Sequence, residues 1–101
     1  MAMQLPAKLL DLVEDPEVRD LVISGDYGAI DRGQGLCQIA SPFTRAELEG
    51  ELRQLAFEAG ERCDIAKPAA DIAFDRFRIH AVLPFGISDA PQLSLRVHPK
   101  E

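Results

Sequence analysis

The segment Phe77-Arg78-Ile79-His80-Ala81-Val82-Leu83 alternates between apolar and polar residues over most of its length. An alternation of period two predicts a strand with one buried face and one face toward water. The later segment Gln92-Leu93-Ser94-Leu95-Arg96-Val97 repeats the alternation. If the two strands pair antiparallel, their polar side chains share one face of a sheet. These side chains belong to Arg78, His80, Ser94 and Arg96, with His98 next in phase.

Further strands are expected on the N-terminal side of this pair. Apolar and β-branched runs predict them at Asp20–Ser24, at Tyr27–Asp31, at Leu36–Ile39 and at Asp71–Phe74. The connection Arg32-Gly33-Gln34-Gly35 has two glycines that can adopt the positive φ a hairpin needs. Residues 84–91, which contain two prolines and a glycine, are expected to form a loop.

Two amphipathic helices complete the predicted elements. The first covers Leu5–Val13, and the second begins at the capping box Thr44-Arg45-Ala46-Glu47 and ends at Gly60. The order is then helix, three strands, helix, three strands, with mostly hairpin connections. This order predicts an α+β domain with a mostly antiparallel sheet of five to six strands and two main helices packed on one face.

Length and charge narrow the class of protein. The chain has 101 residues, so we expect residues 1–101 to form a single domain around one core. The net charge of −6 argues against direct nucleic-acid binding, and no apolar run is long enough for membrane insertion. Cys37 and Cys63 show no metal-ligand spacing, so no metal site is expected and both are interpreted as reduced, packed thiols.

The polar face of the last two strands is the candidate site. Residues 76–101 carry four Lys or Arg and two Asp or Glu, whereas the rest of the chain is strongly acidic, so a locally cationic face is expected. Arg78 and Arg96 would offer planar sets of donors suited to phosphate or carboxylate. The alternative is an ordinary solvated sheet face. His80 has no nucleophile or metal-ligand partner at a recognisable spacing, which favours a structural role over general-base catalysis.

Several blocks of the sequence, in order, resemble one protein family. They are Asp15–Gly25 (DPEVRDLVISG), Ile30–Leu36 (IDRGQGL), Ala59–Asp64 (AGERCD), Arg78–Pro84 (RIHAVLP) and Leu93–Val97 (LSLRV). Together they resemble the N-terminal domain of type II and type IV secretion traffic ATPases, in the Tad-pilus or CpaF-like branch. The resemblance covers about residues 10 to 98. The connection Phe74-Asp75-Arg76-Phe77 is shorter than the family's glycine-containing hairpin. The resemblance therefore does not fix the direction in which the Arg78 side chain points.

This resemblance implies a domain that precedes a RecA-like ATPase domain in a hexameric ring and covers the ATP and Mg bound there. Arg78 and Arg96, with His80 as a weaker neighbour, would contact the phosphates. The implied partners are that ATPase domain, neighbouring ring subunits and inner-membrane secretion or pilus components, at the cytoplasmic side of the inner membrane. No G-x-x-x-x-G-K-[ST] motif occurs in this chain, so by itself it is expected to bind no cofactor and to hydrolyse no ATP.

Two other classes of protein stay open. A free-standing, PAS-like interaction or ligand-sensing module would use the same sheet face to hold a peptide or a small ligand. A small hydrolase or isomerase is the weakest alternative, because no catalytic pairing is evident.

Overall fold

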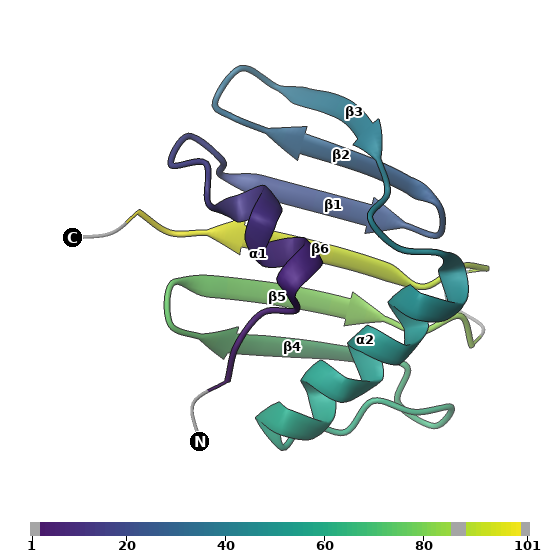
Figure 1. Ribbon diagram of the computed structural model, residues 1–101. Helices are drawn as coiled ribbons and strands as arrows, with labels where there is room; N and C mark the ends of the chain where they lie inside the picture. The colour runs from purple at the N-terminus through teal and green to yellow at the C-terminus, as the bar shows by residue number, and fades with distance from the viewer. Residues whose placement is uncertain (1–2, 86–88, 100–101) are drawn as a thin grey trace.

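A computed structural model describes residues 3–85 and 89–99, and it has two layers, a six-stranded sheet and a pair of helices (Figure 1). Both helices lie on the same face of the sheet, and the other face has no helix over it. The shortest dimension of the molecule, 19 Å, agrees with one sheet plus one helical layer. The predicted α+β class and the one-sided helical packing are therefore confirmed.

The observed elements follow the predicted order closely. They are α1 (Ala7–Val13), β1 (Asp20–Ser24), β2 (Tyr27–Asp31), β3 (Leu36–Ala40), α2 (Arg45–Ala59), β4 (Ala69–Phe74), β5 (Phe77–Val82) and β6 (Gln92–Val97). β4 begins two residues earlier than expected, and β5 ends one residue earlier, at Val82. The Leu83 amide still donates to the Pro68 carbonyl, but Pro68 has no amide hydrogen to donate in return. Residues 86–88 of the expected loop lie outside the described residues. Neither helix in the described part of the chain is long and apolar enough to span a bilayer.

The sheet consists of two hairpin-linked halves joined in the middle. Its strand order is β3-β2-β1-β6-β5-β4, and every neighbouring pair is antiparallel. β1 to β3 form one half, β4 to β6 form the other, and β1 pairs with β6. The first and last strands of the chain are thus the two central strands of the sheet.

The core lies between the sheet and the helices. Inward-facing residues of the central strands, such as Leu21, Ile23, Leu93 and Leu95, are at most 1% exposed. The helices contribute a buried stripe of residues, namely Leu9, Val13, Leu48, Leu52, Leu55 and Ala56. Since the inward faces of the strands are all apolar, the outward faces are left to carry the polar residues.

Helix α2 begins beside β6 and runs across β5 to beyond the β4 edge of the sheet (Figure 1). Its 15 residues span about 22 Å. Thr44 Oγ1 accepts from the Glu47 amide at 3.1 Å, and Glu47 Oε1 accepts from the Thr44 amide at 2.9 Å. Gly60 ends the helix with φ of 72°. The predicted capping box and glycine terminator are both present.

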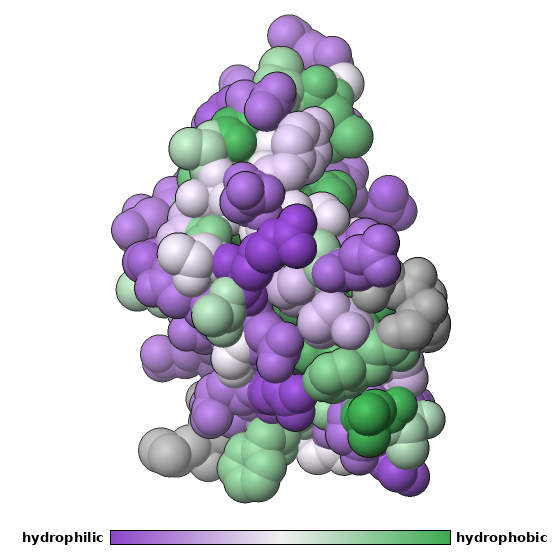
Figure 2. All heavy atoms as spheres, turned by 90° about the vertical axis from the view of Figure 1, so that its right-hand side faces the viewer, coloured by the Kyte–Doolittle hydropathy of each residue, from purple (hydrophilic) through white to green (hydrophobic). Residues whose placement is uncertain are grey.

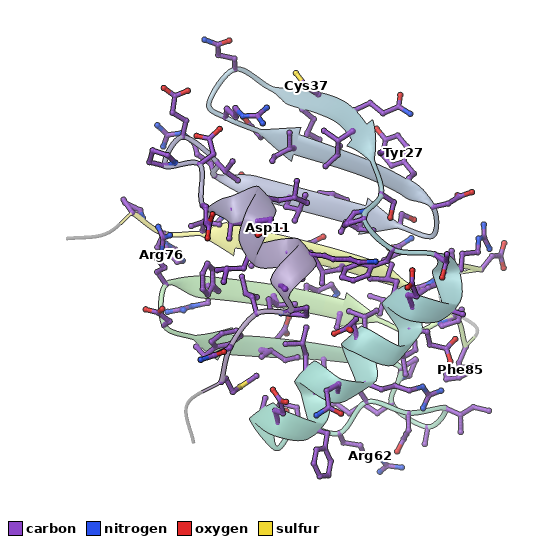
Figure 3. The ribbon with its side chains drawn as sticks, viewed as in Figure 1. Asp11, Tyr27, Cys37, Arg62, Arg76 and Phe85 are labelled. Carbon is purple, nitrogen blue, oxygen red and sulfur yellow. The ribbon has the colours of Figure 1, made fainter. Side chains whose placement is uncertain are left out.

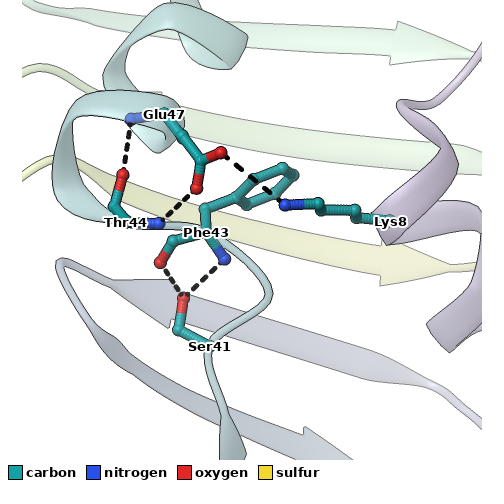
Figure 4. Close-up of polar contacts among 5 residues, drawn as sticks. All are labelled: Lys8, Ser41, Phe43, Thr44 and Glu47. Atoms are coloured by element: carbon teal, nitrogen blue, oxygen red, sulfur yellow. Dashed lines mark hydrogen bonds and ion pairs between the residues drawn. The ribbon is translucent and has the colours of Figure 1, made fainter.

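Contacts at the start of α2 also hold α1 in place (Figure 4). Lys8 Nζ lies 3.7 Å from Glu47 Oε2 and 5.5 Å from the centre of the Phe43 ring. Ser41 Oγ donates to the Phe43 carbonyl and accepts from its amide. The hydrogen bond from the Thr44 amide, followed by the charge of Lys8, lowers the pKa of Glu47. One carboxylate therefore caps one helix and anchors the other.

Replacing Thr44 with Ala removes the acceptor for the Glu47 amide, and we expect it to lower the free energy of unfolding by about 1 kcal/mol. Urea denaturation monitored by circular dichroism measures the change. Thr44→Ser keeps the hydroxyl and serves as the control. An equal loss in Thr44→Ser and Thr44→Ala would contradict a capping role for the hydroxyl.

Candidate functional site

The helix-free face of the sheet carries two rows of side chains that run across four strands. The first row is Asp20, Arg96, Arg78 and Ala73, which are successive Cα partners from β1 through β6 and β5 to β4. The second row is Val22, Ser94, His80 and Asp71. Arg78 and Arg96 are therefore direct cross-strand neighbours on one face, as the alternation of the two strands predicts.

These two rows line an open groove of about 440 Å³. The groove spans β1, β6, β5 and β4. Its floor includes the backbone of residues whose side chains point toward the helices, namely Leu21, Ile72, Ile79 and Leu95. Its side-chain lining is formed by Asp20, Val22, Asp71, Ala73, Arg78, His80, Ser94 and Arg96. Arg78, His80 and Arg96 are thus brought together in one concave surface, whereas His98 is not among its lining residues.

The groove is not a purely cationic surface, in contrast to the expectation from the sequence. Arg96 Nε lies 3.1 Å from Asp20 Oδ1, and His80 Nδ1 lies 2.7 Å from Asp71 Oδ1. Two guanidinium groups and one imidazole therefore share the groove with two carboxylates. The prediction of a cationic face is wrong, because β1 and β4 flank the two basic strands and each contributes an aspartate.

Arg78 differs from Arg96 in having no carboxylate partner within 4 Å among the described residues. Its Nη1 donates to the carbonyl of Phe77, the preceding residue, at 3.0 Å. Both arginines are exposed, and the side chain of Arg96 retains 68% of its accessible surface. The Arg78 guanidinium is therefore open to an anion that approaches this face, whereas the Arg96 guanidinium already contacts Asp20.

The short connection between β4 and β5 is a tight turn at one end of the groove. Asp75 adopts a left-handed conformation with φ of 51°, and Phe74 and Phe77 are Cα partners on either side. The two rings meet edge to face at 5.6 Å, and the Arg76 guanidinium lies 5.5 Å from the Phe77 ring. The turn preserves the strand register, so Arg78 lines the groove although the turn contains no glycine.

Two aspartates of the groove, Asp20 and Asp71, and the exposure of Cys37 are not predicted by the sequence. The sequence predicts Asp20 only as the first residue of a strand, although its alternation with Leu21 places it on the polar face. Its position beside Arg96 depends on the pairing of β1 with β6, which the sequence alone does not show. Cys37 is exposed rather than packed, because it lies on the edge strand β3 (Figure 3). Cys63 is half-buried, and burial raises the pKa of its thiol. Both cysteines are free thiols.

Exposed apolar side chains lie away from the groove. Phe57 on α2 and Ile65 in the following connection are 80% and 77% exposed. Figure 2 shows a mostly hydrophilic side of the molecule, with hydrophobic atoms in separate small groups toward its upper and lower ends. These two residues add no chemistry to the groove.

Comparison with solved structures identifies a similar fold. The VirB11 ATPase of the Brucella suis type IV secretion system, solved in complex with sulphate, matches with a TM-score of 0.81. The chain therefore has the fold of part of a secretion ATPase. The match covers 93% of this chain but only 30% of the VirB11 chain, and sequence identity is 14%. No protein-family model matches the sequence, and no curated protein matches it either.

Replacing Arg78 with Ala is expected to change the free energy of unfolding by less than about 0.5 kcal/mol, since the side chain is exposed and opposes another arginine. Leu95→Ala on the adjacent strand β6 is the contrasting variant. Leu95 is 1% exposed, and its truncation is expected to cost about 2 to 5 kcal/mol. Urea titration of both variants gives the comparison, and equal losses would contradict the outward placement of Arg78.

Proposed function

We propose that this chain is the N-terminal domain of a bacterial secretion or Flp-type pilus assembly ATPase, of the Tad-pilus or CpaF-like branch. In this role its groove covers ATP and Mg held by a RecA-like ATPase domain of the same protein. Arg78 and Arg96 contact the phosphates, with His80 beside them. The protein works in the cytoplasm at the inner membrane, with ring neighbours and membrane-bound secretion or pilus components as partners.

The observation that carries this proposal is the cross-strand pairing of Arg78 with Arg96 on the uncovered face. Two exposed guanidinium groups one strand spacing apart can both donate to one phosphate group or to two adjacent ones. The likeness in fold to a secretion ATPase supports the proposal, as do the ordered sequence blocks. In the proposed role, closure of the groove on the nucleotide favours one arrangement of the two domains over another.

The residues of the groove suit a phosphate contact better than catalysis. Arg78 and Arg96 supply charged donors, whereas the carboxylates of Asp20 and Asp71 are occupied by Arg96 and His80. The sequence contains no Walker A loop to hold the nucleotide. The chemistry of hydrolysis is accordingly assigned to the other domain, and this chain contributes binding and domain coupling.

The groove itself favours one second candidate, a free-standing PAS-like sensor or interaction module. Its volume of about 440 Å³ falls within the range of about 300 to 1,000 Å³ that is typical of small-ligand sites. The open reading frame distinguishes the two candidates. A Walker A motif encoded within about a hundred codons after Glu101 supports the ATPase domain, and a stop codon there supports the free-standing module.

We expect Arg78→Ala or Arg96→Ala, made in the full-length protein, to lower ATP turnover about tenfold or more, because each change removes charge-assisted hydrogen bonds to phosphate. Arg62→Ala is the matched control. The Arg62 side chain is 64% exposed, similar to Arg96, and it pairs with Asp64 outside the groove. Steady-state phosphate release measures the effect. Wild-type turnover in both groove variants would refute the assignment.

A further inference from the structure

The groove contains a carboxylate, that of Asp20, beside the arginines that are proposed to bind phosphate. Asp20 is the Cα partner of Arg96, which in turn is the Cα partner of Arg78, so a carboxylate and two guanidinium groups lie in one row. Like charges directly opposite each other on neighbouring strands are destabilising. Asp20 Oδ1 lies 3.1 Å from Arg96 Nε, so it offsets that repulsion from the β1 side.

We infer that Asp20 is an intramolecular competitor for the anion that binds Arg78 and Arg96. This inference rests on the proposed function, and it adds a residue that sets how tightly the groove holds phosphate. An incoming phosphate must either replace the carboxylate at Arg96 or bind close to its negative charge. Both routes weaken binding relative to a groove without Asp20.

The two arginines then have different roles. Arg78 has no carboxylate within 4 Å among the described residues, so it is available to an anion from the outset. Arg96 becomes available only when its contact with Asp20 is given up. The Asp20 side chain is 32% exposed, so solvent screens the pair and the exchange costs little. The contact is weak enough for a phosphate with more than one negative charge to displace it.

The test measures binding of sodium tripolyphosphate to the 101-residue chain at constant ionic strength, by isothermal titration calorimetry. We expect Asp20→Asn to lower the apparent dissociation constant about two- to fivefold, the range given by an exposed ion pair. Glu49→Gln is the matched control. Glu49 is 35% exposed and pairs with Arg53 at 3.4 Å on α2, in the layer on the other side of the sheet. The control removes the same charge from the same kind of pair, so it is expected to bind like the wild type.

Arg78→Ala and Arg96→Ala in the Asp20→Asn background separate this inference from the proposed function. Loss of binding in both, together with tighter binding in Asp20→Asn, supports the competitor role. The role of Asp20 is overturned, and the proposed phosphate contact is not, if binding depends on the arginines but Asp20→Asn does not raise the affinity for tripolyphosphate. The same holds if Glu49→Gln raises that affinity equally. An affinity that is unchanged in both arginine variants, or no binding by any variant, overturns the proposed phosphate contact as well. Circular dichroism checks folding, and Asp20→Ser replaces Asp20→Asn if that variant does not fold.

Discussion

The antiparallel pairing of β1 with β6 is the contact on which the rest of the structure depends. It joins two three-stranded halves that hairpins could form separately, and it aligns Leu21 with Leu95 and Ile23 with Leu93 at the centre of the core. The two strands are about 70 residues apart in the sequence, so forming this contact closes a long loop and carries an entropic cost. Burial of apolar side chains on both strands offsets that cost.

The same pairing determines what the open face contains. Because side chains alternate along each strand, alignment of the apolar residues on the helical side fixes the partners on the other side. A register that pairs Leu21 with Leu95 necessarily pairs Asp20 with Arg96. The mixed charge of the groove is therefore a consequence of core packing, and a shift of one residue would bury the charged side chains instead.

Local signals in the sequence predicted most of the fold. The capping box at Thr44, the terminator Gly60 and the glycines of the 32–35 hairpin act over a few residues, and all are present as expected. Alternation likewise predicted that Arg78 and Arg96 share a face. Which strands lie next to each other is decided by contacts far apart in the sequence, so Asp20 and Asp71 could not be assigned to the site. Exposure of Cys37 was missed for the same reason, because only the strand order shows that β3 is an edge.

The net charge of the chain and the local charges of the groove affect anion binding in opposite ways. The chain as a whole carries a net charge of −6, so its long-range field repels a polyanion such as a nucleotide. Within the groove, the two guanidinium groups attract phosphate only at short range, and the carboxylates of Asp20 and Asp71 oppose that attraction. A site of this kind binds free anions from solution weakly, with an affinity that a titration at high ligand concentration still measures. It is better suited to an anion delivered at high effective concentration by a covalently linked domain, where tethering replaces electrostatic steering. In the proposed role, a weak, partly self-neutralised groove would have an advantage, because it would close on a nucleotide held by the linked domain and release it when the charge of that nucleotide changes.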